Sequence, residues 1–261
     1  MECKSILCVK HGPLIGLDRH AHNIARFLIY ENIYDEELIS PWFRIASGIN
    51  KVHYVSDKYD NYVQWCGPAI DYENEKSKFH SKLIHALTFF NFVWGGFEAY
   101  IDTLDLPNCK KYRGEINKIN YFLKEKYLNN HPIPEHYNKV VDTLKKMIIL
   151  NPWYGNSEIL FKPNVCEVEE LLGLKIVYKI RNLFAHGAFT FSEPEGWNGT
   201  KPLDVEIISA SSRIVLFTMQ MLLYANNNLG FKVPQLHEDE EAGAKADKFI
   251  INLHKKSYRH C

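Results

Sequence analysis

Three polar side chains that can engage a phosphate lie within six residues of one apolar segment, "YKIRNLFAHGAF", residues 178–189. They are Arg181, Asn182 and His186. In an α-helix each residue advances by about 100° and ~1.5 Å, so Asn182 and His186 lie on one face, roughly 6 Å apart along the axis. Arg181 is the neighbour of Asn182, and its long side chain can reach toward that face. We therefore expect the three side chains to converge on one anion.

The chemistry of these residue types suits a ribose–phosphate link. A guanidinium binds phosphate through paired donors, an imidazole can move a proton near neutral pH, and Asn182 could orient His186 or hold the ribose. Gly187 is a natural residue to follow a helix end, so we expect His186 at the helix C-terminus, where the dipole favours its protonated form. On spacing alone, a surface ion pair with a capping histidine is the more common origin of such a pattern.

A second helix with a polar stripe is predicted over residues 81–105, in "SKLIHALTFFNFVWGGFEAYIDTLDLP". It is apolar nearly all round, which predicts burial on several sides. Asn91, Glu98 and Asp102 are the exceptions, and their spacing places them on one narrow stripe. Because a carboxylate is costly to bury without a positive partner, we expect Glu98 to pair with Arg181.

Two adjacent glycines interrupt the same predicted helix. Gly95 and Gly96 each cost about 1 kcal/mol relative to Ala in a helix interior. We therefore expect another part of the protein to approach the helix backbone closely at this point.

The remaining pattern predicts a mostly α fold built on long antiparallel helices. Apolar periodicity and capping residues indicate helices over 18–34, 81–105 (with Ser81 as N-cap), 115–128, 135–150, 165–186 and 205–228 (with Asp204 as cap). Two β-rich runs, 51–56 and 62–66, predict a short hairpin in an N-terminal extension, and residues 151–163 read as a loop.

Composition excludes several classes of function. The chain has 261 residues, of which 46% are hydrophobic and 24% charged, as in ordinary globular proteins. Lysine plus arginine balance aspartate plus glutamate at 31 each, so a nucleic acid would have to bind a local basic patch, for instance one built between subunits. No signal peptide or 18-residue apolar run is evident, and the six cysteines form no CxxC pair, which indicates a reducing cytoplasm and no membrane contact.

Metal and cofactor sites are not predicted. The twelve histidines include no pair at i, i+4, the spacing that places two imidazoles on one helix face. The sequence also lacks a P-loop, a GxGxxG and a GxSxG, so we expect no cofactor.

The six residues "RNLFAH", 181–186, resemble the R-x4-6-H motif of the HEPN superfamily in its common form, with Asn directly after Arg and Gly after His. The setting is similar as well, because the motif ends one predicted long helix, another follows it, and the polar-striped helix precedes it. The resemblance covers about residues 78–230. We accordingly expect a HEPN-like helical bundle at 78–230, an N-terminal extension at 1–77 and a charged tail with a short helix at 231–261.

The resemblance implies a metal-independent endoribonuclease, often a toxin or an antiphage effector that halts growth by cutting RNA. It implies a homodimer in which the two motifs meet, with RNA as substrate and an antitoxin or regulatory protein as a further partner. His186 would be the general acid/base, Arg181 would stabilise transition-state charge, Asn182 would position the reacting groups, and Glu98 would be the polar residue that faces the site. Lys175 and Lys179 would add positive charge to the groove.

One departure from the family pattern puts a mode of control in doubt, and one alternative function stays open. HEPN toxins that are controlled by nucleotidyltransferases often carry a tyrosine two positions after the histidine, and Ala188 stands there in this chain. A non-catalytic helical module that binds RNA, a nucleotide or a protein partner is the alternative to the ribonuclease.

Overall fold

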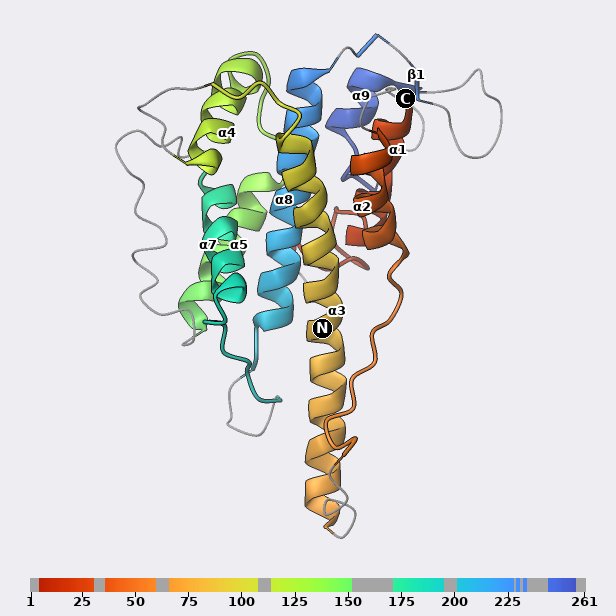
Figure 1. The fold of residues 1–261 in the computed structure, drawn as a ribbon, viewed down its shortest axis with the longest axis vertical. Coiled ribbons are helices and arrows are strands. Elements are labelled where there is room, and N and C mark those ends of the chain that lie inside the picture. The colour runs from red at the N-terminus through yellow and green to blue at the C-terminus, as the bar shows by residue number, and fades with distance from the viewer. Residues whose placement is uncertain are drawn as a thin grey trace.

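The computed structural model describes residues 5–30, 36–59, 66–107, 114–151, 171–194, 201–227, 229–230, 232–233 and 244–256. This part of the chain is mostly helical, as predicted (Figure 1). Its helices are α1 (Leu17–Tyr30), α2 (Glu36–Gly48), α3 (Gly67–Ile101), α4 (Glu115–Leu123) with a π-helical extension (Lys124–Leu128), α5 (Tyr137–Leu150), α7 (Leu172–Ala185), α8 (Asp204–Asn226) and α9 (Ala246–Ile251). Two short strands, β1 (Lys232–Val233) and β2 (Ala244–Lys245), pair antiparallel.

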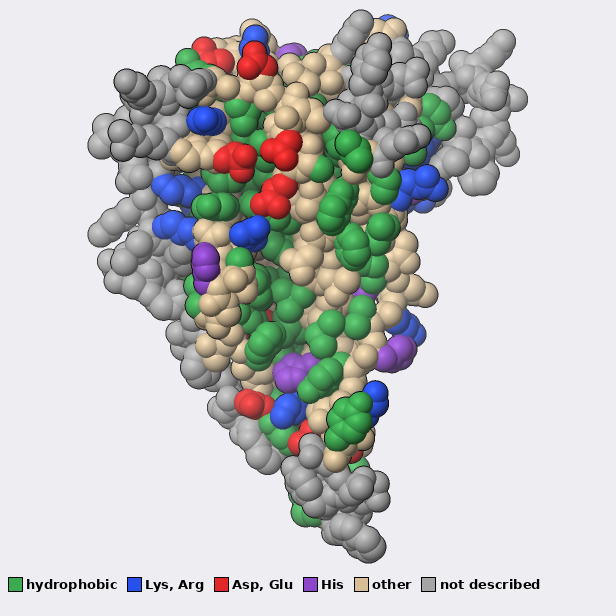
Figure 2. Space-filling view, viewed as in Figure 1, with side chains coloured by type: hydrophobic (Ala, Val, Ile, Leu, Met, Phe, Trp, Pro, Cys, Tyr) green, Lys and Arg blue, Asp and Glu red, His purple; other side chains and the backbone are tan. Residues whose placement is uncertain are grey.

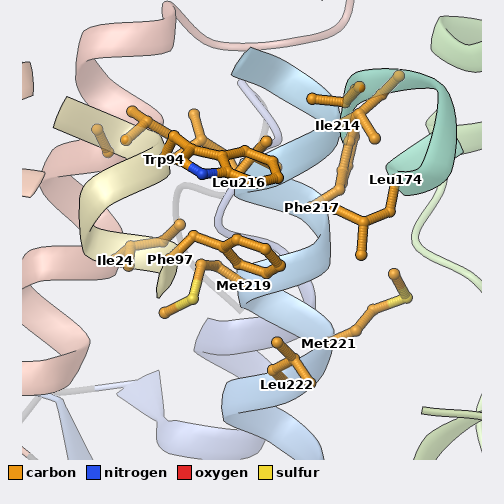
Figure 3. Close-up of a cluster of buried hydrophobic side chains, with 14 of the residues drawn as sticks. Ile24, Trp94, Phe97, Leu174, Ile214, Leu216, Phe217, Met219, Met221 and Leu222 are labelled. Atoms are coloured by element: carbon orange, nitrogen blue, oxygen red, sulfur yellow. The ribbon is translucent and has the colours of Figure 1, made fainter. Parts of the chain in front are cut away.

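Helix α8 is the centre of the bundle. It packs against α1, α3, α5, α7 and α9, and most of its side chains are buried. Figure 3 shows the core that results, in which Phe217 and Met219 of α8 lie among side chains of α1, α3 and α7. By length and composition α8 could also cross a membrane, but 89% of its apolar window is buried inside the protein, as expected of a central core helix.

Helix α3 begins 14 residues earlier than the sequence pattern predicts. The N-cap predicted at Ser81 is wrong, because α3 starts at Gly67 with a proline in its first turn, where the missing N–H costs nothing. The added turns, "DYENEKSKFH", are rich in polar helix formers and lack an apolar stripe, so periodicity does not reveal them. The Ser81 hydroxyl instead accepts the backbone N–H of Tyr54, at 2.9 Å.

The segment before α3 runs beside that helix as an extended chain (orange in Figure 1). The Ser56 backbone N–H donates to the Ser77 hydroxyl at 3.0 Å, and the Ser56 hydroxyl donates to the carbonyl of Glu73 at 2.9 Å. No strand forms within residues 51–59, so the predicted hairpin is not confirmed, and its second run falls largely at 60–65, outside the described residues.

The boundary predicted between residues 77 and 78 lies inside α3. Helices α1 and α2 of the predicted N-terminal extension pack on α8 and α3 respectively, and their buried side chains join the same hydrophobic core. The structure therefore shows no separation at that point in the chain.

The predicted close approach at the two glycines of α3 is confirmed. A Cβ added to Gly95 would lie 2.6 Å from the Trp42 ring, and one added to Gly96 would lie 2.7 Å from the Phe43 ring. Both rings belong to α2. The glycines therefore allow the α2 aromatic side chains to lie directly on the α3 backbone.

The other predicted helices agree closely with the structure. Helices α4 and α5 match the predictions at 115–128 and 135–150, and α8 begins at Asp204, with Leu203 rather than Asp204 in the N-cap position. Asp204 is fully buried, and its burial raises the pKa of its carboxyl. The predicted loop after residue 151 and the predicted helix start at 165 lie at 152–170, outside the described residues.

Candidate functional site

Helix α7 is held against α3 by two contacts, one turn apart on each helix. The Tyr178 ring stacks on the Trp94 ring, with centroids 6.3 Å apart and planes inclined at 30°. One turn further along both helices, Arg181 Nη2 lies 3.4 Å from Glu98 Oε1. Buried side chains that include Leu174, Val177 and Ile180 anchor α7 in the core.

The predicted pairing of Glu98 with Arg181 is therefore present. The two side chains are 43% and 36% exposed, so solvent screens the pair and its contribution to folding is about 1 kcal/mol or less. A guanidinium has five N–H donors, and this contact occupies one terminal nitrogen. The pair therefore serves mainly to orient Arg181 at the surface, where the guanidinium can still bind an anion.

A second face of α7 carries basic and polar side chains in line. Lys175, Lys179, Asn182 and His186 follow one another at intervals of four, three and four residues, which places them within about 60° around the axis. Partial burial lowers the pKa of Lys175, and the neighbouring positive charge of Lys179 lowers it further. The mutual repulsion shows that the two lysines concentrate positive charge on this face.

His186 stands at the C-terminal end of this face, exposed to solvent. Its backbone N–H donates to the Asn182 carbonyl at 3.0 Å, and Gly187 follows with a φ of +65°. The N–H of Ala188 then donates to the Leu183 carbonyl at 2.8 Å, which completes a Schellman motif. The prediction that Gly187 ends this helix is confirmed, and the imidazole projects where the chain leaves the bundle.

The chain beyond this turn folds back onto the helix. The Phe189 ring lies 4.2 Å from the Phe184 ring, centroid to centroid, and it also contacts Phe191. This aromatic contact spans the Gly187 turn and fixes the direction in which the chain continues after His186.

Arg181 and His186 do not share a face of α7. Four residues lie between them, so five residue steps rotate one from the other by about 140° around the axis. Among the described residues, the guanidinium contacts Glu98, and the imidazole makes no hydrogen bond or ion pair. The predicted convergence of the two groups on one phosphate within a single chain is therefore not seen.

Other carboxylates lie near Glu98, the partner of Arg181, and one of them, Glu115, is not among the predicted site residues. Partial burial raises the pKa of Glu115 in the first turn of α4, and the negative charges of Asp102 and Glu98 raise it further. Figure 2 shows acidic side chains grouped beside a basic one near the upper end of α3. Sequence gives no signal for Glu115, because an acidic residue in the first turn of a helix is common for electrostatic reasons alone.

The described residues contain no group of three or more His, Cys, Asp or Glu side chains arranged to hold a metal ion. The absence of a cofactor remains a prediction.

Comparisons with protein-family models, curated proteins and solved structures find no significant match to this chain. The resemblance to HEPN proteins consequently rests on the motif at 181–186 and on its helical setting.

Proposed function

We propose that this protein is a metal-independent endoribonuclease of HEPN type, a cytoplasmic toxin or antiphage effector that cuts RNA. The observation that carries the proposal is the exposed His186 at the end of the basic face of α7, one and a half turns from a guanidinium that Glu98 orients at the surface. A proton-transfer group and an anion-binding group are thus both accessible to a polynucleotide.

The reaction follows from these groups. One His186 accepts the proton of a ribose 2′-hydroxyl, whose oxygen bonds to the adjacent phosphorus while the bond from phosphorus to the 5′-oxygen breaks. The leaving 5′-oxygen takes up a proton from water. The products are a 2′,3′-cyclic phosphate and a 5′-hydroxyl, and no metal takes part.

Arg181 and the lysine-bearing face have electrostatic roles in this reaction. The guanidinium stabilises the charge that develops on the phosphorane-like transition state. Lys175 and Lys179 lie along the line that leads to His186, where they can contact neighbouring phosphates. Asn182, between Lys179 and His186 on that line, is placed to hold the ribose.

A homodimer brings Arg181 of one chain to His186 of the other, and an exposed apolar face is available to form it. Leu38, Trp42 and Ile45 of α2 are 65%, 38% and 49% exposed and are spaced to form one stripe. Trp42 lies on Gly95 of α3, one turn before Glu98. A partner that covers this stripe would be next to the Glu98–Arg181 pair, as a composite site requires.

A mixing experiment tests the composite site. Arg181→Ala and His186→Ala are each expected to abolish cleavage of total RNA, whereas His11→Ala, an exposed histidine elsewhere, should leave cleavage unchanged. Unfolded and refolded together, the two inactive chains should regain about a quarter of wild-type activity if each site takes its arginine from one chain and its histidine from the other. That fraction follows from random pairing, which makes half of the dimers mixed with one intact site in each.

The outcomes separate the possible answers. Recovery of activity supports the composite ribonuclease site. Two inactive variants that do not complement each other would place Arg181 and His186 of the same chain in each site. RNA that is bound but never cut by the wild type would instead favour the non-catalytic binding module.

A further inference from the structure

A large cavity lies on the side of α3 that faces away from the Glu98–Arg181 pair. Its volume is about 880 Å³, within the range of small-molecule sites. Its walls come from four segments: the N-terminal chain through the start of α1, the extended chain at 49–53, the middle of α3 and the first half of α8. Phe89, which lines the cavity, is nine residues from Glu98 and thus about 180° around the helix from it.

A buried arginine reaches the cavity from α8. Arg213 is only 3% exposed, and its guanidinium contacts His20 Nδ1 at 2.8 Å and donates to the carbonyl of Ile15. Among the described residues, no carboxylate lies within ion-pair distance of it. Burial lowers the pKa of Arg213 to about 9, against an opposing effect of the negative charge of Asp18, so Arg213 is still charged at neutral pH. A buried charge without an ion-pair partner is costly, and an anionic or strongly polar ligand would offset that cost.

Further basic groups surround the cavity. Lys78 and Lys82 of α3 and Lys51 of the extended chain line it and are exposed at its rim. His85, one turn after Lys82, also lines it, and its Nδ1 is buried without a hydrogen-bond partner. Asp18 is the one acidic residue in the described lining. The net charge of the cavity is therefore positive.

The remaining wall combines apolar side chains with the polar residues Asn50, His53, Ser81, Ser209 and Ser212. Leu17, Ala86, Phe89 and Val205 present hydrophobic surface between the buried Arg213 and the rim lysines. A simple inorganic anion would leave this surface in contact with water, whereas a ring system would cover it and gain about 25 cal/mol for each Å² removed from solvent.

We propose that this cavity binds a nucleotide. The phosphates meet the rim lysines Lys51, Lys78 and Lys82, the base packs against Phe89 and Leu17, and Arg213 with His85 hydrogen-bonds ring nitrogen or carbonyl groups of the base. This site is separate from the face of α7 that carries His186, and the inference does not depend on the proposed ribonuclease activity.

Isothermal titration calorimetry with ATP, GTP, AMP and inorganic phosphate tests this proposal on the full chain. At least one of the nucleotides should bind more tightly than phosphate. The double variant Lys78→Glu/Lys82→Glu should weaken that binding by about a hundredfold, since each reversed charge costs about tenfold in affinity. These lysines are exposed, so the variant should fold, and its melting temperature checks this.

The matched control is Lys139→Glu/Lys146→Glu, which makes the same charge change at exposed positions of α5. It should keep wild-type affinity. The proposal is overturned if none of the nucleotides binds, if phosphate alone binds as well as the nucleotides, or if the two double variants lose affinity equally. Binding of a short single-stranded RNA that depends on Lys78 and Lys82, without binding of any mononucleotide, would also overturn it.

Discussion

Lowering the pH from 7 to 5 should weaken folding through two histidines buried beside α8. His20 of α1 and His254 near the C-terminus are both 0% exposed, with ring centroids 6.1 Å apart. Arginine can only donate hydrogen bonds, so the 2.8 Å contact from Arg213 requires His20 Nδ1 to be the acceptor. The His254 Nδ1 contacts Gln220 Oε1 at 3.1 Å. Neutral imidazoles can make both hydrogen bonds. A proton on His20 Nδ1 would remove the hydrogen bond from Arg213 and place two positive charges in contact.

The magnitude follows from the pKa of His254. Burial, followed by the charges of Lys255, Arg213 and His136, lowers that pKa to about 3, against an opposing effect of Glu135. Because an unfolded histidine has a pKa of about 6.5, the unfolded chain binds more protons between these two values, and stability falls as the pH is lowered. From pH 7 to pH 5 this histidine alone should cost about 2 kcal/mol. Burial and the charge of Arg213 also lower the pKa of His20, which adds to the loss.

Urea unfolding at pH 7, 6 and 5 measures this effect. The His254→Gln variant should be less stable than the wild type at pH 7 but should lose about 2 kcal/mol less on going to pH 5. The control His53→Gln, at an exposed histidine, should reproduce the wild-type pH dependence. Equal pH dependence in the His254→Gln variant and the wild type would refute the reasoning.

Two glycine substitutions test the packing and the turn. Gly96→Ala should lower stability by about 1–3 kcal/mol in thermal denaturation, because its Cβ would lie 2.7 Å from the Phe43 ring. The control Gly48→Ala, with no atom within 4 Å of its Cβ, should be neutral or slightly stabilising. Equal effects of the two substitutions would contradict the packing argument. Gly187→Ala should cost about 1–2 kcal/mol because of its φ of +65° and should reduce RNA cleavage by displacing His186, whereas Gly187→Asn should be milder; an unchanged rate in Gly187→Ala would show that the turn does not position the imidazole.

Helix periodicity predicted most of the bundle, but α2 (Glu36–Gly48) was not predicted. Helices α4, α5 and α8 lie where apolar spacing indicates them. The first 14 residues of α3 were missed because a solvated helix of polar residues carries no apolar period. The predicted hairpin rested on β propensity at 51–56, but this segment bonds to side chains of α3 through Ser77 and Ser81 instead of to a second strand.

Two features of the candidate site could be predicted from residue types and spacing. The predicted pairing of Glu98 with Arg181 is present, although Glu98 is 43% exposed and its burial is therefore not the cause. Gly187 indicated the helix end at His186, and this feature is present as well. The orientation of Arg181 was not predictable, because it depends on how α7 packs against α3. The cavity beside Arg213 was not predictable either, because four segments far apart in the sequence form it.

The most direct test of the central claim is the analysis of RNA ends after incubation with the purified protein in EDTA. The account predicts that the wild type generates 2′,3′-cyclic phosphate and 5′-hydroxyl ends without a divalent metal, and that His186→Ala, folded as the wild type is, generates none. Cleavage that requires a metal, that leaves 5′-phosphate ends, or that persists in His186→Ala would contradict it.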